Sequence, residues 1–357
     1  MIENANETIV QYLRVAKQFG ASDLHIAVGV RPKCRIRGEL QEIAVADKLF
    51  PADTKALVEA MFTPRQQEIF NKFGEVDFAY AVPDIGRFRV NAFRQRGSCG
   101  AVLRLVGTEI PTPQSLGIPL SVVELTKRKR GLVLVTGPTG SGKSTTLASL
   151  IDVINKNYNT HIITLEDPIE YLHNHNKAVV NQREIGLDTQ SYANGLRAAL
   201  REDPDVILVG EMRDLDTIST AITAAETGHL VFSTLHTIGA APTIDRIIDV
   251  FPPHQQDQIR VQLASVLECV ISQQLLPTSD GRGRVAAFEV MHATAAIKNL
   301  IRESKSHQID GMIQTSKKMG MQTMDDALFE LYLKHRIDGA SAIEFATDPL
   351  VMQEKVY

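Results

Sequence analysis

Tryptophan is absent from this sequence of 357 residues, and cysteine occurs only three times, as Cys34, Cys99 and Cys269. Because these cysteines are scattered singly, they form no C-x-x-C pair for a zinc or redox site, and we expect reduced thiols. No apolar run approaches the ~18 residues of a membrane-spanning helix, and the first residues lack the basic and apolar regions of a signal peptide. We therefore expect a cytoplasmic protein without a transmembrane segment, or one peripheral to a membrane from the cytoplasmic side.

The sequence also lacks an excess of positive charge, since 38 lysine and arginine residues stand against 42 aspartate and glutamate residues and the formal net charge is −4. Nucleic-acid-binding domains usually carry a strong basic balance and often stack bases on aromatic side chains. The acidic balance and the lack of tryptophan therefore argue against a nucleic-acid partner. The one basic run, Lys127–Arg130, is expected to be a solvated face, with contact to anionic lipid or to an acidic neighbouring subunit as the alternative.

The length of the chain predicts two domains. Residues 1–110 combine helical stretches with short alternating strands, which predicts a smaller α+β domain with an antiparallel sheet. Residues 111–120 are rich in proline and glycine and are expected to be a stiff linker. In residues 121–357 strands alternate with helices, which predicts an α/β domain with a mainly parallel sheet covered on both faces. The expected strands of this sheet are 132–136, 161–165, 206–209 and 230–235.

One stretch of the second domain matches the phosphate-loop pattern G-x-x-x-x-G-K-[ST]. It follows an apolar run and precedes a helical stretch, which is the context that this pattern requires. Its glycines allow a tight turn, so that backbone N–H groups and the helix N-terminus can point at phosphate oxygens. Lys143 would reach the β- and γ-phosphates of a nucleoside triphosphate, and the Ser144 hydroxyl would bind Mg²⁺. The candidate nucleotide-binding residues are Gly137, Pro138, Thr139, Gly140, Ser141, Gly142, Lys143, Ser144 and Thr145.

Polar residues at the ends of the other predicted strands should meet this loop, because ligands bind at the carboxyl ends of parallel strands. Glu211 follows four apolar residues and is expected to be the general base that activates water. Glu166 and Asp167 are expected to hold Mg²⁺ through its water shell or to orient the nucleophilic water. His236 would sense the γ-phosphate by donating a hydrogen bond. The alternative for these acids is a role as solvated turn residues.

Four segments together resemble the signature boxes of the secretion and type IV pilus ATPases, and in particular the pilus-retraction branch of that family. Two further segments are similar to that branch, in which arginine is usual at the position of Lys298. The four boxes are Gly137–Thr145, Ile163–Glu170, Leu200–Asp214 and Thr227–Thr237, and the further segments are Gly20–His25 and Ala296–Glu303.

The resemblance implies a hexameric ring in which each subunit has a PAS-like N-terminal domain and a RecA-like ATPase domain. It implies ATP and Mg²⁺ at subunit interfaces, hydrolysis that powers pilus retraction, and docking on a platform protein of the inner membrane. In the family, arginines of the N-terminal domain reach the nucleotide, and Arg89 and Arg104 match best, with Arg94 and Arg96 as alternatives. An accessory or regulatory retraction ATPase, itself a potential partner, and a nucleic-acid translocase remain the alternative functions.

The segment Ala296–Glu303 is expected to form a helix, with Thr294 as its N-cap. Lys298 and Arg302 would share the outer face as a like-charge pair, which is unfavourable in an isolated helix. In the family that this chain resembles, this segment is associated with retraction rather than with hydrolysis. The resemblance therefore leads to the hypothesis that this face transmits nucleotide-driven motion to a partner or between domains, with a merely solvated helix face as the alternative. The apolar positions expected to face inward are Ile297, Leu300 and Ile301.

Overall fold

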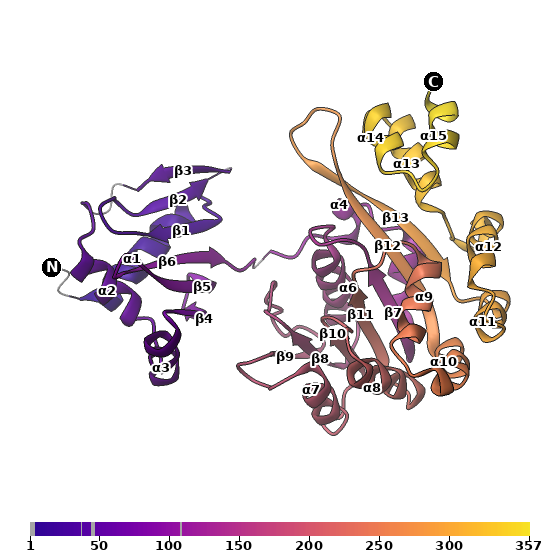
Figure 1. The fold of residues 1–357 in the computed structure, drawn as a ribbon, viewed down its shortest axis with the longest axis horizontal. Coiled ribbons are helices and arrows are strands. Elements are labelled where there is room, and N and C mark those ends of the chain that lie inside the picture. Colours follow the sequence, from indigo (N-terminus) through magenta and orange to yellow (C-terminus); the bar gives the residue numbers. More distant parts are fainter. Residues whose placement is uncertain (1–3, 37, 44–46, 108) are drawn as a thin grey trace. The chain divides into compact units, whose positions relative to one another are not determined.

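The computed structural model describes residues 4–36, 38–43, 47–107 and 109–357. Residues 1–3, 37, 44–46 and 108, which belong to the predicted N-terminal domain, lie outside the described residues. The chain divides into two compact units, Met1–Thr108 and Glu109–Tyr357, which are the indigo-to-purple and the magenta-to-yellow parts of Figure 1.

The first unit contains a six-stranded sheet in the order β3-β2-β1-β6-β5-β4, in which all neighbouring strands are antiparallel. Buried residues of β5 alternate with exposed or half-buried ones, because successive side chains of a strand point to opposite faces. The buried face packs on three helices and forms the core of this unit. The elements are α1 (Ala5–Gln18), β1 (Asp23–Ile26), β2 (Lys33–Ile36), β3 (Glu39–Glu42), α2 (Pro51–Glu59), α3 (Pro64–Phe73), β4 (Glu75–Val82), β5 (Gly86–Gln95) and β6 (Ser98–Leu105).

The second unit contains a seven-stranded sheet in the order β13-β12-β7-β11-β10-β8-β9. All pairs are parallel except β12 with β13, which form an antiparallel hairpin. The four strands expected from the sequence are present within one residue at each end, as β7, β8, β10 and β11, so the predicted α/β class is confirmed. The strands are β7 (Gly131–Thr136), β8 (His161–Glu166), β9 (Val179–Glu184), β10 (Val206–Val209), β11 (Leu230–Leu235), β12 (Leu267–Pro277) and β13 (Arg284–His292).

Helices cover both faces of this sheet, as Figure 1 shows. Alternate residues of β7 therefore enter two different cores. Leu132 and Leu134 pack on the side of α8, α9 and α10, whereas Val133 and Val135 pack on the side of α6. The helices are α6 (Lys143–Asn157), α7 (Tyr192–Ala199), α8 (Leu215–Glu226), α9 (Ala240–Asp249) and α10 (Pro253–Val266).

Residues 111–120, which we expected to be a linker, are packed on the second unit. Thr112 caps the short helix α4 (Pro113–Leu116), which ends at Gly117 in the left-handed conformation and contacts α6. Ile118 is buried in the core on the α6 side. Proline at a helix start and glycine at its end are ordinary helix boundaries, and here the proline and glycine residues serve as such. Helix α5 (Leu120–Val123) and the 3₁₀-helix η1 (Glu124–Lys127) follow.

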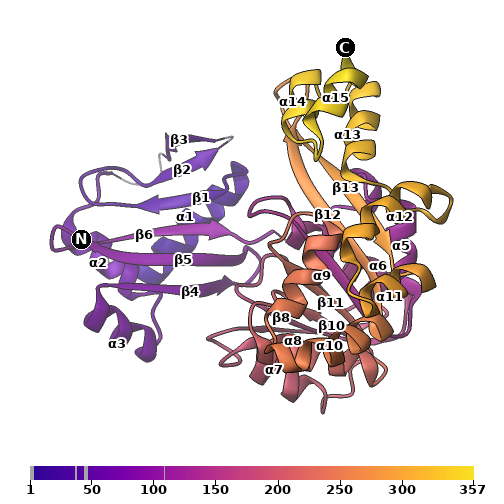
Figure 2. The same ribbon diagram turned by 45° about the vertical axis from the view of Figure 1, so that its right-hand side comes forward.

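The C-terminal part of the second unit is helical. Helices α13, α14 and α15 gather around the far part of the β12–β13 hairpin in Figure 2, and they share with it a small separate core. Among the residues that the structure describes, no helix is both long enough and apolar enough to cross a bilayer. The elements are α11 (Ala295–Arg302), η2 (Ser306–Gln308), α12 (Ile309–Thr315), η3 (Lys317–Met319), α13 (Met324–Leu333), α14 (Gly339–Glu344) and α15 (Pro349–Val356).

Candidate functional site

The predicted phosphate loop joins the end of β7 to the start of α6. Gly137, Gly140 and Gly142 all have positive φ angles, of 143°, 80° and 89°, which residues with a side chain rarely adopt. Lys143 is buried, and its Nζ donates to the carbonyl oxygens of Gly137 at 2.9 Å and Pro138 at 3.0 Å. Burial lowers the pKa of Lys143, although Glu211 and Glu170 act in the opposite direction. Carbonyl groups of the loop therefore accept the hydrogen bonds that Lys143 donates in this structure.

The loop borders a cavity of about 300 Å³ at the carboxyl ends of the parallel strands. Strands β8, β10, β7 and β11 are close neighbours in the sheet, so the polar residues that follow them meet at one edge. The three groups singled out from the sequence all reach this cavity. Its polar lining includes Lys143, Ser144, Glu166, Asp167, Glu211 and His236.

Glu211 is connected to the phosphate loop through a histidine. Its side chain is 16% exposed, and its Oε1 lies 3.0 Å from Nε2 of His236. Nδ1 of His236 is 3.5 Å from the Thr139 hydroxyl of the loop. The Oε1 atom of Glu211 also accepts a hydrogen bond from Nε of Arg213. Arg213 was not among the predicted site residues, although its place two residues after Glu211 could have indicated it.

Glu166 is held by two neighbouring side chains. Its Oε1 accepts from the Thr164 hydroxyl at 2.6 Å and from Nε2 of Gln182 at 3.1 Å. Burial raises the pKa of Glu166 above its ordinary value, in spite of these hydrogen bonds, which lower it. Asp167 is exposed at the border of the same cavity. An oriented carboxylate with a raised pKa is a suitable proton acceptor.

Two tyrosines that we did not predict also line the cavity. The Tyr171 hydroxyl lies 3.1 Å from the Thr145 hydroxyl at the start of α6. Burial raises the pKa of Tyr192, and the nearby carboxylates of Asp167, Glu211 and Glu166 raise it further. Tyr192 therefore remains a neutral hydrogen-bonding group beside the acids.

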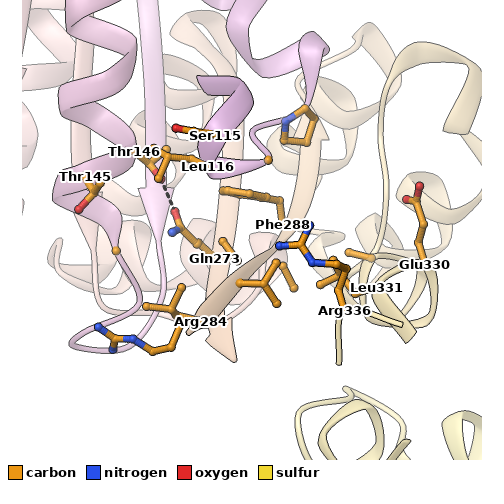
Figure 3. Close-up of a pocket in the computed structure, with 18 of the residues that line it drawn as sticks. Ser115, Leu116, Thr145, Thr146, Gln273, Arg284, Phe288, Glu330, Leu331 and Arg336 are labelled. Carbon is orange, nitrogen blue, oxygen red and sulfur yellow. Dashed lines mark hydrogen bonds between the residues drawn. The ribbon is translucent and has the colours of Figure 1, made fainter. Parts of the chain in front are cut away.

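A second cavity, of about 590 Å³, lies on the other side of the phosphate loop. Figure 3 shows Thr145 and Thr146 of α6 at one end of it, with Phe288 between them and Arg336. Its far wall comes from the β12–β13 hairpin and α13. No local sequence pattern marks this wall, because its residues lie more than a hundred positions away from the loop, as the separation of 127 between Thr146 and Gln273 illustrates.

The predicted arginines of the first unit lie on β5 and β6. Arg89 and Arg104 are direct cross-strand partners on the exposed face of the sheet. Nε of Arg104 donates to Oδ1 of Asp23 at 2.8 Å, and that carboxylate is only 5% exposed. Arg94 lies over the Phe70 ring near the end of β5.

The helix expected at Ala296–Glu303 is α11, and Thr294 caps it by accepting a hydrogen bond from the N–H of Ile297. The expected placement of Lys298 on the outer face is wrong. The Lys298 side chain is 22% exposed and lies 3.9 Å from Glu268, and its Nζ donates to the carbonyl oxygen of Ser265. Ser265 at the end of α10 and Glu268 at the start of β12 hold Lys298 inward, and only Arg302 of the predicted pair remains exposed. Of the expected apolar positions, Ile297 and Ile301 are buried and Leu300 is half-buried.

A phosphate loop before a helix, followed by acids and a histidine at the ends of neighbouring parallel strands, defines a P-loop ATPase. Residues 118–333 match the family model described as Type II/IV secretion system protein, and the chain belongs to that family.

Individual relatives agree with this assignment. The chain is 48% identical over 344 residues to the type IV pilus retraction ATPase PilT of Pseudomonas aeruginosa, covering 96% of this chain and 98% of that one. It is 42% identical over 334 residues to the type IV pilus ATPase PilU of the same organism, covering 94% and 87%. The crystal structure of the pilus retraction motor PilT with bound ADP superposes with a TM-score of 0.90 at 49% identity, covering 98% of both chains. These matches confirm the family, the fold class and the ATPase activity predicted from the sequence.

Proposed function

We propose that this chain is a hexameric motor that hydrolyses ATP in the presence of Mg²⁺ to power the retraction of type IV pili. The observation that carries this proposal is the convergence of Lys143, Glu166, Glu211 and His236 on one cavity beside the phosphate loop. The names of the PilT relative and of the ADP-bound PilT structure support the retraction role.

The residues around the loop suit a triphosphate with Mg²⁺. Backbone N–H groups of the loop and the start of α6 would hold the phosphates. The Ser144 hydroxyl and the exposed Asp167 carboxylate offer the oxygen ligands that Mg²⁺ prefers, the latter through water. Bound Mg²⁺ would supply positive charge that offsets the negative charge on the phosphate oxygens during transfer of the γ-phosphoryl group. Lys143 would then exchange its two carbonyl acceptors for phosphate oxygens.

Glu211 is the proposed general base, and His236 is the proposed sensor that reports on the phosphate through Thr139 and Glu211. Glu166 is the second candidate for the base. Burial raises its pKa, and Thr164 and Gln182 fix its orientation. Arg213 and His236 both contact Glu211. In the alternative assignment, Glu211 therefore has an electrostatic role and Glu166 accepts the proton of the attacking water.

The nucleoside end of ATP would occupy the cavity of Figure 3. This cavity shares Gly142, Thr145 and Thr146 with the loop and first helical turn, and it combines an apolar wall at Phe288 with the cation of Arg336. A base and a ribose need such a mixture of apolar surface and a few polar groups.

In the proposed ring, Arg89 and Arg104 bring positive charge to the nucleotide of a neighbouring subunit. Their exposure on one face of the β5–β6 ladder supports this role, because the guanidinium groups face away from the core of the first unit. The platform protein of the inner membrane is the proposed partner, and the cytoplasmic side of that membrane is the proposed location.

The test combines three measurements on the purified full chain: ATPase activity, native mass, and rescue of pilus retraction in cells that lack their own retraction ATPase. Activity, a hexameric mass and rescue would support the proposal. Activity without rescue would instead favour an accessory retraction ATPase, the alternative suggested by the similarity to PilU. Absence of ATP hydrolysis by the hexamer would contradict the motor itself.

A further inference from the structure

Gln273 of β12 is a buried polar residue that contacts the phosphate loop from outside the predicted motifs. Its side chain is 3% exposed. Nε2 donates to the carbonyl oxygen of Ser141 at 2.6 Å, and Oε1 accepts from the Thr146 hydroxyl at 2.8 Å. Figure 3 shows the second of these bonds, between Gln273 and the first turn of α6. One amide thus ties the phosphate loop to the helix that follows it.

The bond to Ser141 has a geometric consequence for the loop. In a trans peptide the C=O and the following N–H point in opposite directions. Because Gln273 holds the Ser141 carbonyl, the N–H of Gly142 must point away from Gln273. Backbone N–H groups are the phosphate ligands of such a loop. We infer that Gln273 is a positioning residue, which sets the orientation of the Ser141–Gly142 peptide and thereby the affinity of the site for nucleotide phosphates.

Two of the loop glycines give this residue its space. A Cβ atom at position 137 would lie 2.2 Å from the backbone oxygen of Gln273, and a Cβ atom at position 142 would lie 2.9 Å from its Nε2. The backbone contact exists because β12 is the sheet neighbour of β7, with Ser272 in register with Thr136. Glycine is therefore needed at positions 137 and 142 for two reasons: it adopts the positive φ angles, and it leaves room for Gln273.

The neighbouring residue extends the same arrangement to the histidine segment. The Ser272 hydroxyl oxygen accepts from the N–H of Gly239 at 2.9 Å, three residues after His236. Successive residues of β12 thus hold the phosphate loop and the segment that carries His236. This arrangement acts on the shape of the binding site, and neither residue is among those that line the cavity around Glu211.

Glutamine is suited to this position because it offers one donor group and one acceptor on the same planar end. Ionised glutamate has the same shape but cannot donate to the Ser141 carbonyl, and methionine has a similar length without either function. Both substitutions therefore remove hydrogen bonds of Gln273 while they keep most of its packing. Gln274 is a matched control, since it is next in sequence, points to the other side of β12 and only reaches Phe345 at 3.4 Å.

The experiment measures binding of a fluorescent ADP analogue, and KM and kcat for ATP, on full-length Gln273→Met, Gln273→Glu, Thr146→Val and Gln274→Met. Losing the bond to Ser141 should weaken ADP binding and raise KM about tenfold, the usual scale of one lost hydrogen bond to a buried group. The kcat should stay within about threefold of wild type, because bound substrate and transition state lose the same contact. Thr146→Val keeps the bond to Ser141 and should lose less affinity than either Gln273 variant, and Gln274→Met should bind like wild type.

The inference would be overturned by a Gln273→Glu protein that binds ADP as tightly as wild type, because that variant keeps the shape and lacks the donor. It would also be overturned if kcat fell while KM and ADP affinity stayed unchanged, since that pattern indicates a role in the chemical step. If Gln273→Met does not fold, Gln273→Glu and Thr146→Val still show whether ADP affinity or kcat is the quantity that falls. A loss of thermal stability with normal ADP affinity in these variants would reduce Gln273 to a packing residue.

Discussion

His236 and Glu211 are joined across the ends of two adjacent parallel strands, with Nε2 of the histidine 3.0 Å from Oε1 of the glutamate. The same imidazole reaches the phosphate loop at Thr139. A change at the phosphates can therefore reach the acid through one side chain. Glu211 and Glu166 are the two candidates for the general base, and the first experiment should distinguish between them.

We expect Glu211→Gln to bind ATP and to lose at least about 10²-fold in turnover, the range that a general base contributes. Glutamine keeps the size and the acceptor oxygen but cannot take a proton at neutral pH. ATP binding and single-turnover hydrolysis should be measured on the same protein. Glu166→Gln is the matched variant, and a wild-type rate in Glu211→Gln together with a loss in Glu166→Gln would move the base to Glu166.

Burial raises the pKa of Glu166, which predicts a particular dependence of stability on pH. A group with a raised folded-state pKa favours folding when protonated, so its contribution is present at low pH and is lost as pH rises through the folded-state pKa. Above its folded-state pKa the ionised Glu166 therefore opposes folding. Glu166→Gln stays neutral and should raise the melting temperature at pH 8 more than at pH 5. An equal change at both pH values would contradict this account, and Glu211→Gln serves as the comparison.

We expect Lys143→Ala to weaken ATP and ADP binding by about 10²-fold, because hydrogen bonds from a charged donor to phosphate are among the strong ones. The substitution also leaves the carbonyls of Gly137 and Pro138 without the donor they have now. Binding should be measured by titration with a fluorescent nucleotide, and native mass should be checked on the same sample. Tight binding in the alanine variant would show that the loop N–H groups suffice without the lysine.

The sequence was sufficient for the parts of the site that are continuous along the chain. Gly137–Thr145 carries its own turn, donors and helix start, so local chemistry determines its shape. Gln273 and Gln182 escaped prediction because they reach the site through the order of strands in the sheet, which no short pattern encodes. Lys298 was placed wrongly for a related reason. Helical spacing correctly located its neighbours Ile297 and Ile301, but the acceptors of Lys298 come from other elements, Ser265 from α10 and Glu268 from β12.

Segment 111–120 illustrates a second kind of error. Its prolines and Gly117 suggested a linker, yet Thr112 and Pro113 begin a short helix and Gly117 ends it. Proline and glycine mark helix boundaries as readily as loops. The burial of Ile118 shows that this segment is a packed helical segment and not a linker. Burial depends on the packing of the whole domain, so the local sequence does not reveal it.

The N-terminal arginines give a prediction about the ring. If Arg89 and Arg104 act on the nucleotide of a neighbouring subunit, Arg89→Ala and Arg104→Ala should each lower turnover by up to about 10³-fold, the lower end for an arginine finger. Mixing either variant with Lys143→Ala protein should restore part of the activity, because mixed rings contain intact interfaces. Full activity of a dilute, verified monomer would exclude the mechanism.

The two arginines should differ in stability. Arg104→Ala leaves the buried carboxylate of Asp23 without its ion pair, so this variant should melt at a lower temperature than Arg89→Ala. Arg104→Lys is the matched control, since it keeps a cation near Asp23 and loses the planar guanidinium. Equal melting temperatures for the two alanine variants would contradict the structural importance of the Asp23 pair.

The final prediction concerns α11, whose exposed face carries Arg302 while Lys298 is turned toward Ser265 and Glu268. Arg302→Ala should leave the melting temperature and the ATPase rate near wild type, because substitutions of exposed residues usually change stability little. If the helix passes nucleotide-driven motion to a partner through this face, pilus retraction in cells should fail in the same variant. Normal retraction speed would remove Arg302 from that role, and a parallel loss of ATPase activity would place α11 within the catalytic machinery.

Lys298 provides the matched comparison on the same helix. Lys298→Ala removes the contacts to the end of α10 and should lower stability by up to about 1 kcal/mol, the scale of a partly exposed ion pair, which corresponds to roughly 2–4 °C for a unit of this size. Lys298→Arg keeps a cation opposite Glu268 and should behave like wild type in both stability and retraction. A retraction defect in Lys298→Ala that Lys298→Arg repairs, with Arg302→Ala unaffected, would show that the packing of α11 on α10 matters for retraction and its outer face does not.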